Sequence, residues 1–318
     1  MTAVTTPHRI VSLISSATEI LYGLGLGDRL VAVSHECDWP AAAASLPQAT
    51  FSNIDSAAAS GQIDDQVKQQ LTAGEPLYEI DRELLESLAP DLIVTQAQCD
   101  VCAVKYDDVA ELVQTSPALA ETRIVSLAPE MLDEVLSDIR RVGEAAGVQA
   151  AAEDYLQQLE RRLRDVQQTV AQAARVDRPR VAIIEWLEPM MIAGNWTPGL
   201  VDRAGGKYDL AVEGRHSEYV DWSKLASYDP EVLVIAPCGF DIERTLRETD
   251  TLTARSEWRQ LSAVRSGRVF VMDGNAYLNR SGPRLVDTAE ILSHLIHPGL
   301  CGPPAAVGDS AQAWRPFV

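Results

Sequence analysis

A long run of helical periodicity near the middle of the chain, from Val148 to Ala174, constrains the fold most strongly. Apolar residues recur there at spacings of three and four, and Gln, Arg, Glu and Asp fill the other faces. The apolar stripe consists of Tyr155, Leu156, Leu159, Leu163, Val166 and Val170. No Gly or Pro occurs between Val148 and Arg178, and a helix of that length spans roughly 35–40 Å. We predict a rigid helix about as long as a domain is wide.

The sequences on either side of this predicted helix resemble each other. Before it, Leu84–Thr95 has the pattern of a short helix, a turn with Pro followed by an acid, and a buried strand; after it, Trp222–Ile235 repeats the pattern. Each part opens on a basic residue and an apolar run, at Arg9 and at Arg180. We predict two similar α/β lobes, duplicated from one unit of roughly 100 residues. The alternative is that short hydrophobic strands are alike by chance.

The predicted organisation has four parts: an N-terminal α/β lobe over residues 1–147, a linking helix over 148–178, a C-terminal α/β lobe over 179–298, and a flexible tail over 299–318. The tail is rich in Pro, Gly and Ala, so we expect it to be largely disordered. Both lobes should contain central, parallel-rich sheets, with a ligand cleft between the lobes. The predicted strands are Ile10–Leu13, Leu30–Val33, Leu92–Thr95, Arg123–Leu127, Val181–Ile184, Val232–Ala236 and Val269–Met272.

Charge and composition exclude several classes of protein. The net charge of −19 argues against nucleic acid or an anionic membrane as the main partner, because both attract basic surfaces. No apolar run approaches the length of a membrane span, and Met1–His8 lacks the pattern of a signal peptide. We therefore expect a cytoplasmic protein without membrane insertion, whose cysteines are ligands, redox groups or core residues.

Four of the five cysteines follow predicted strands, at the sheet edge where open α/β sheets bind ligands. Cys99 and Cys238 follow the two matching Pro-acid turns at nearly the same distance, so we expect them to face each other across the cleft. With Leu30–Val33 and Leu92–Thr95 as neighbouring strands, four thiols would converge on one zinc ion or iron–sulfur cluster. The predicted metal ligands are Cys37, Cys99, Cys102 and Cys238. The alternatives are redox or ligand-contacting thiols and simple core packing, which we expect for Cys301.

Aromatic residues gather in or near the same loops: Trp39, Trp186, Trp196, Trp222 and Tyr277. Tryptophans beside Pro, Asn and Gly in loops favour the lining of a large, flat, partly apolar ligand. Core packing is the alternative, and Trp222 could instead cap its helix. His35 could ligate a metal or donate a hydrogen bond. Asn279, Arg280 and Arg284 could hold a polar or anionic edge of the ligand.

These features resemble the cobalamin- and siderophore-type substrate-binding proteins of ABC importers. The opening Ile10–Ile20, Pro90–Val94 and Pro230–Val234 look like that family. The loops His35–Pro40, Gln98–Cys102 and Pro237–Asp241 are similar to its cobalamin-binding branch. The resemblance covers Arg9–Pro298. It implies the helical-backbone fold, a corrinoid or other metal chelate between the lobes, little hinge motion and a possible ABC permease partner. Ser15 and Ser16 in the opening motif are included among the expected ligand contacts.

We therefore expect a binding protein rather than an enzyme: a cytoplasmic relative of the importers' receptors that holds a corrinoid or another metal-centred ligand. The alternative is a metalloprotein or enzyme whose four cysteines bind zinc or an iron–sulfur cluster. In that case Glu185, Glu188 and Asp241 could act as acid–base groups. The sequence contains no evident Ser/His/Asp arrangement, phosphate loop or dinucleotide fingerprint.

Overall fold

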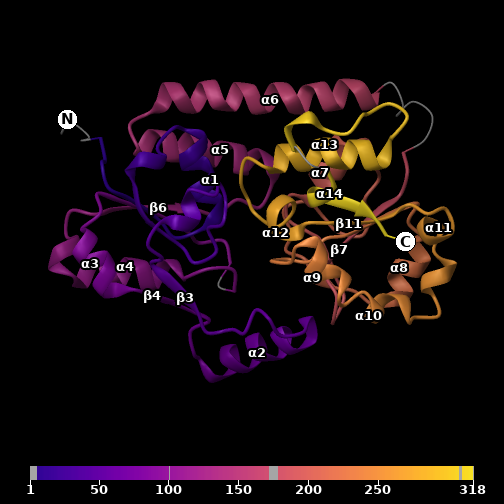
Figure 1. Ribbon diagram of the computed structural model, residues 1–318, viewed down its shortest axis with the longest axis horizontal. Helices are drawn as coiled ribbons and strands as arrows, with labels where there is room; N and C mark the ends of the chain where they lie inside the picture. Colours follow the sequence, from indigo (N-terminus) through magenta and orange to yellow (C-terminus); the bar gives the residue numbers. More distant parts are fainter. Residues whose placement is uncertain (1–5, 100, 172–177, 308–309, 318) are drawn as a thin grey trace. The chain divides into compact units, whose positions relative to one another are not determined.

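The computed structural model describes residues 6–99, 101–171, 178–307 and 310–317 (Figure 1). The chain divides into two compact units, which we describe separately. Unit 1 comprises Met1–Ala58, Asp65–Pro129 and Asp133–Gln158; unit 2 comprises Ala59–Asp64, Glu130–Leu132 and Leu159–Val318. Nowhere in the described ranges is there a helix with the length and apolar character needed to cross a membrane.

The predicted long helix is confirmed as α6, Gln149–Ala171, drawn as one continuous ribbon in Figure 1. Its stripe is buried at Leu156, Leu159, Leu163, Val166 and Val170. The remainder of the predicted linking helix, from residue 172 to 177, lies outside the described residues. Burial of one apolar face, rather than intrinsic propensity alone, explains why so long a helix forms.

Unit 1 contains a parallel sheet with the strand order β2-β1-β5-β6. Its strands are β1 Ile10–Ser12, β2 Leu30–Val33, β5 Leu92–Gln96 and β6 Arg123–Leu127. A separate antiparallel hairpin pairs β3 Thr50–Ser52 with β4 Tyr78–Ile80. The helices of this part of the sequence are α1 Ser15–Gly23, α2 Ser60–Ala73, α3 Arg82–Leu88, α4 Tyr106–Thr115 and α5 Leu132–Ala145. Parallel strands covered on both faces are apolar along their length, which is why the sequence predicted them well.

The predicted neighbourhood of Leu30–Val33 and Leu92–Thr95 is wrong. Strand β1 lies between them and pairs with β2 along one edge and with β5 along the other. The loops that follow β2 and β5 are therefore two strand spacings apart, about 9–10 Å, instead of one. Local sequence carries apolar character but says nothing of which strand occupies the middle of a sheet.

Unit 2 contains a mixed sheet with the order β12-β11-β10-β7-β8-β9. The parallel strands are β7 Val181–Trp186, β10 Val232–Ile235 and β11 Val269–Met272. The antiparallel strands are β8 Met191–Ile192, β9 Glu218–Tyr219 and β12 Trp314–Pro316. The helices are α7 Thr197–Arg203, α8 Trp222–Tyr228, α9 Ile242–Leu246, α10 Asp250–Thr253, α11 Ser262–Arg265, α12 Gly274–Tyr277, α13 Leu285–Ile296 and α14 Ser310–Ala313.

The prediction of a disordered tail is wrong for its described part. Strand β12, near the end of the chain, pairs antiparallel with β11 and occupies an edge of the sheet that would otherwise be open. Trp314 is buried, and its ring lies 5.7 Å from that of His294. Cys301 is also buried, in agreement with the packing role expected for it. Three residues were enough for pairing because the neighbouring strand supplies the hydrogen bonds.

The predicted repeat holds for the three central strands of each sheet and fails for the fourth. β1, β5 and β6 have the same order and direction as β7, β10 and β11. The next strand is parallel in unit 1, where β2 pairs with β1, and antiparallel in unit 2, where β8 pairs with β7. The shared element is therefore a three-stranded parallel core.

The Pro-acid turn makes equivalent contacts in the two units. In unit 1, Ala89 has a left-handed backbone with φ of 41°, and the Asp91 carboxylate accepts hydrogen bonds from the backbone of His8 and Arg9 at 2.8 and 2.9 Å. The Arg9 side chain donates to the Leu88 carbonyl at 2.6 Å. The turn thereby fastens the start of β5 to the start of β1.

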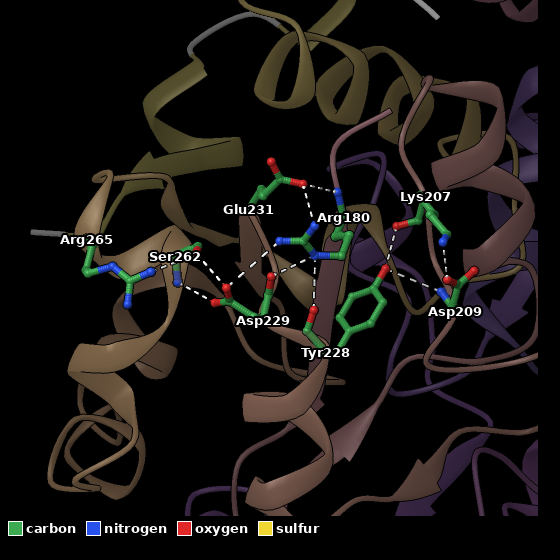
Figure 2. A network of polar contacts seen from close by, with 8 residues as sticks. All are labelled: Arg180, Lys207, Asp209, Tyr228, Asp229, Glu231, Ser262 and Arg265. Atoms are coloured by element: carbon green, nitrogen blue, oxygen red, sulfur yellow. Dashed lines mark hydrogen bonds and ion pairs between the residues drawn. The ribbon is translucent and has the colours of Figure 1, made fainter. Parts of the chain in front are cut away.

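In unit 2 the same contacts fasten β10 to β7 (Figure 2). Asp229 has φ of 46°, and Glu231 accepts a hydrogen bond from the Arg180 backbone at 3.0 Å. The Arg180 Nε donates to the carbonyls of Tyr228 and Asp229 at 3.1 and 2.9 Å. The Asp229 carboxylate also accepts two bonds from Ser262, at 2.7 and 2.6 Å. This network lies at the amino ends of the parallel strands, opposite the edge where ligands bind.

We expect Arg180→Ala to lower the free energy of unfolding of unit 2 by about 1–2 kcal/mol, because two hydrogen bonds and two ion pairs are lost from a partly exposed side chain. Urea unfolding of wild type and variant measures this. Arg164→Ala is the matched control, since Arg164 makes an exposed pair with Glu160 at 3.4 Å within α6, and we expect a change below about 0.5 kcal/mol. Equal effects in the two variants would contradict a fastening role.

Candidate ligand-binding site

The loops after β1 and β2 in unit 1 are tied together by hydroxyl groups. Ser15, at the start of α1, is buried and donates to the Glu36 carbonyl at 3.0 Å. The Thr18 hydroxyl donates to Ser12 Oγ at 2.8 Å and lies 3.1 Å from Cys37 Sγ. Ser16 is buried as well. The predicted contacts Ser15 and Ser16 therefore lie at the carboxyl edge of the sheet.

His35 lies in the loop after β2 and is held by Thr50 of the β3 hairpin. Its backbone N–H donates to Thr50 Oγ1 at 3.1 Å, and its ring Nδ1 lies 2.7 Å from the same oxygen. The ring of Tyr78 is 5.7 Å away. Trp39, four residues on, has 45% of its surface exposed, which is high for an indole. This loop thus presents the Trp39 indole to solvent and carries an imidazole that is held by Thr50.

Gln96, which sequence reasoning missed, organises the loop after β5. The residue is buried; its amide N–H donates to the Cys99 carbonyl at 2.7 Å, and its side-chain oxygen accepts from the backbone of Gln98 and Cys99 at 2.7 and 2.9 Å. The Tyr78 hydroxyl donates to the Val101 carbonyl at 3.2 Å. The sequence signal that could have identified Gln96 is a polar residue at the end of a buried apolar strand.

The structure does not support the predicted four-cysteine metal centre. Within the described ranges, no group of three or more His, Cys, Asp or Glu side chains is placed to hold a metal ion. Cys37 is buried against Thr18, whereas Cys102 is exposed, and β1 separates the strands that precede them. Cys238 belongs to unit 2, so its predicted facing to Cys99 stays a prediction.

In unit 2, the loops after β7 and β10 form an aromatic cluster. The rings of Trp186 and Phe240 are 5.3 Å apart, and the Arg244 guanidinium lies 4.5 Å from the centre of the Phe240 ring. The Trp186 indole donates to the Glu188 carbonyl at 3.1 Å. Cys238 is exposed, and its backbone donates to the Glu185 carbonyl at 3.0 Å. Trp186 is therefore held, half-buried, at the carboxyl edge of the sheet.

The loop after β11 is braced against the end of β10. A side chain at Gly274 would lie 2.2 Å from the Pro237 carbonyl, so this close approach requires glycine. Asn279 donates from its amide to the carbonyls of Ala236 and Gly274 at 3.1 and 3.0 Å, which gives this residue a bracing role. Arg280 is mostly buried and donates to Asn275 Oδ1 at 2.9 Å.

Tyr277, at the end of α12, is half-buried under a neighbouring cation. The Arg284 guanidinium lies 5.6 Å from the centre of its ring. Nearby, burial raises the pKa of the Asp273 carboxyl, while Arg284 and Arg280 act in the opposite direction. The loop thus combines an aromatic ring with positive charge, and its contact with a polar edge of a ligand stays a prediction.

Two of the predicted tryptophans pack inside unit 2. Trp196 is buried, and its indole donates to the Leu278 carbonyl at 2.9 Å. Trp222 is buried in the core cluster, where its ring lies 6.4 Å from that of Trp258 in an edge-on arrangement. These side chains support the loops from behind, which is the packing alternative that the sequence left open.

Glu185, near the end of β7, is a partly buried acid in the same region. The Ser217 hydroxyl donates to its carboxylate at 2.5 Å, and Ser217 in turn accepts from the Gly194 backbone at 2.9 Å. Burial raises the pKa of Glu185, with the hydrogen bonds from Ser217 and Gly194 opposing that shift. Burial and the nearby Glu185 charge also raise the pKa of Tyr208 well above its ordinary value.

The chain is similar over most of its length to a family of known proteins. Residues 10–276 match the periplasmic binding protein family. The chain belongs to that family. It is 25% identical over 291 residues to a vitamin B12-binding protein of Vibrio cholerae, covering 89% of this chain and 87% of the relative. It is 22% identical over 293 residues to an uncharacterized ABC transporter substrate-binding lipoprotein of Bacillus subtilis, covering 92% and 81%.

Solved structures of periplasmic binding proteins confirm the predicted two-lobe α/β fold. A periplasmic heme-binding protein from Pseudomonas aeruginosa superposes with a TM-score of 0.70 at 22% identity, covering 92% of this chain and 94% of that one. The periplasmic vitamin B12-binding protein of Vibrio cholerae gives 0.65 at 22% identity, covering 92% and 98%. The resemblance inferred from the opening motif and the Pro-acid turns is thus confirmed.

The raised pKa of Glu185 makes a prediction about pH. The folded chain holds a proton on Glu185 over a range in which the unfolded chain has already lost it. The contribution of this protonation to the free energy of unfolding is fully present below about pH 4 and is lost as the pH rises through the folded-state pKa of Glu185. Glu185→Gln stays neutral and keeps an acceptor for Ser217. We therefore expect its free energy of unfolding, relative to wild type, to increase between about pH 4 and pH 8.

Glu188→Gln is the control for that experiment, because Glu188 is an exposed carboxylate in the same loop. Urea unfolding at several pH values gives the comparison. Parallel stability curves for wild type and Glu185→Gln would show that burial of Glu185 does not control its protonation.

Proposed function

We propose that this chain is the substrate-binding protein of an ABC importer and that its ligand is a corrinoid or a closely related metal tetrapyrrole. The observation that carries the proposal is the match to a vitamin B12-binding relative over 89% of the chain, within a family match from residue 10 to 276. The relative in Bacillus subtilis is described as an ABC transporter substrate-binding lipoprotein, which supports delivery to a permease.

The surfaces at the carboxyl edges of the sheets support a flat ligand. Unit 1 offers the exposed indole of Trp39, in the same loop as His35, and unit 2 offers half-buried Trp186 and Tyr277. Aromatic faces bind planar macrocycles through a large contact area at little cost in side-chain entropy. The guanidinium of Arg284 beside Tyr277 suits the amide or carboxylate groups at the rim of a tetrapyrrole.

The metal-cluster enzyme is the weaker alternative. It required several thiols at one point, and in the described part of the chain no such group of ligands is assembled. A binding protein instead needs preformed surfaces, and the loops here are fixed by hydrogen bonds from side chains to backbone, as at Gln96 and Asn279.

We expect Trp39→Ala to weaken binding of cyanocobalamin or ferric haem by about tenfold, equivalent to about 1.4 kcal/mol of lost aromatic contact. Titration followed by quenching of tryptophan fluorescence and by calorimetry measures the affinity. Leu71→Ala is the control, because Leu71 is an exposed apolar residue on α2 with a similar exposed fraction. Saturable wild-type binding of either probe supports the proposal, and its absence for both would refute it. Unchanged affinity in Trp39→Ala would remove Trp39 from the site.

A further inference from the structure

The first turn of helix α2 is fastened to side chains of unit 2. The backbone N–H of Ser60, the first residue of the helix, donates to the Glu248 carboxylate at 2.8 Å. The Tyr219 hydroxyl donates to the Asp64 carboxylate at 2.6 Å. A negative charge is stabilised at a helix N-terminus, so Glu248 is well suited to hold this end of the helix. These contacts explain why Ala59–Asp64 belong to unit 2, whereas the rest of α2 belongs to unit 1.

Burial of side chains does little to hold α2 in place. Of its 14 residues, all of which the structure describes, only Ser60 is buried. A helix of about this length is marginal in water when little of it is packed. The other end of α2 is tied to the chain that flanks β3 and β4: Gln70 donates to the Asn53 carbonyl, and Asn53 donates to the Pro76 carbonyl, both at 3.0 Å. The helix is thus anchored at its two ends and sparsely packed between them, as in segments that open at low free-energy cost.

Both anchors of α2 adjoin candidate ligand contacts. In unit 1, the chain leads into the β3–β4 hairpin, which holds the loop after β2 by hydrogen bonds. In unit 2, the Glu248 carboxylate lies 2.6 Å from the Arg244 guanidinium, which lies over the Phe240 ring next to Trp186. One helical segment is therefore attached at one end to the hairpin of unit 1 and at the other end to the aromatic cluster of unit 2.

We propose that α2 is a strap that gates ligand exchange. With Ser60 and Asp64 docked on Glu248 and Tyr219, the strap is closed and slows both entry and exit of the ligand. When these two hydrogen bonds break, the strap opens. The proposal rests on the proposed function and adds a gate to it. A gate that interacts equally with the free and the bound protein changes the association and dissociation rates by the same factor, so the affinity stays nearly constant.

The test removes the two docking hydrogen bonds and leaves the aromatic cluster intact. Tyr219→Phe deletes the hydroxyl, and Ser60→Pro deletes the N–H at the first helical position, where proline is tolerated. Tyr106→Phe is the matched control, because Tyr106 is an exposed tyrosine at the start of α4. In the full-length protein without ligand, we expect amide hydrogen exchange in α2 to become about threefold faster in each single variant and about tenfold faster in the double variant. The control should match wild type.

The same proteins are then mixed with cyanocobalamin and with ferric haem, and stopped-flow quenching of tryptophan fluorescence gives the association and dissociation rates. For each probe that wild type binds, both rates should rise about three- to tenfold in the double variant, with Kd changed less than about twofold. Tyr219→Phe retains its ring and every residue of α2, so it tests the gate even where Ser60→Pro disturbs the fold.

Each other outcome counts against the proposal. Unchanged ligand exchange in a variant whose α2 amides exchange faster would overturn the gate and leave the proposed function intact. A rise in the dissociation rate alone would show that α2 contributes to affinity instead of gating exchange. Unchanged hydrogen exchange in α2 would show that the two bonds do not hold the strap. Binding of neither probe by wild type would refute the proposed function and the gate together.

Discussion

Each unit depends on the parallel pairing of two strands. The first is β1 in unit 1 and β7 in unit 2, and the second is the strand that follows the Pro-acid turn. β1 pairs with β5, and β7 with β10, in continuous register. Because both faces of such a sheet are covered, the side chains along the strands must be apolar and polar groups can gather only at the strand ends. The amino ends are occupied by the turn itself, where Asp91 and Glu231 accept backbone hydrogen bonds. The loops at the carboxyl ends of the strands can therefore carry the ligand-binding side chains.

At those carboxyl ends, side chains bind the backbone of neighbouring loops and so fix the loops before any ligand arrives. Ser15 ties the loop after β1 to the loop after β2, Gln96 closes the loop after β5, and Asn279 joins the loops after β10 and β11. Loops held in this way lose little conformational entropy when they bind a ligand, which favours a rigid ligand of matching shape. A flat metal tetrapyrrole meets that description.

Much of this fold could be predicted from the sequence, because apolar runs and helical stripes are local signals. The bounds of β2, β6 and β11 agree with the prediction, and the stripe of α6 is buried as expected. The position of β1 between β2 and β5 could not be predicted, since strand order depends on partners distant in the chain. Strand β12 was missed because its three residues gain order only from the edge of β11.

For the candidate site, the sequence predicts which residues lie in loops after the strands but not which of their side chains are exposed. Loop position drew attention to Trp39 and Trp196 alike, but only the structure shows that Trp39 is exposed and that Trp196 is buried with its indole bonded to Leu278. Cys37 was expected to bind metal, yet it packs against Thr18. The position of the His35 ring depends on Thr50, fifteen residues away along the chain, and sequence pattern contains no signal for that contact.

We propose that one chain binds one metal tetrapyrrole. Native mass spectrometry of the full-length protein, mixed with equal amounts of a cobalamin, ferric haem and a ferric hydroxamate siderophore, tests it most directly. We expect a single dominant complex of one chain with one tetrapyrrole that persists in the presence of the other two compounds. A protein that remains without ligand, or that selects the hydroxamate, would contradict it.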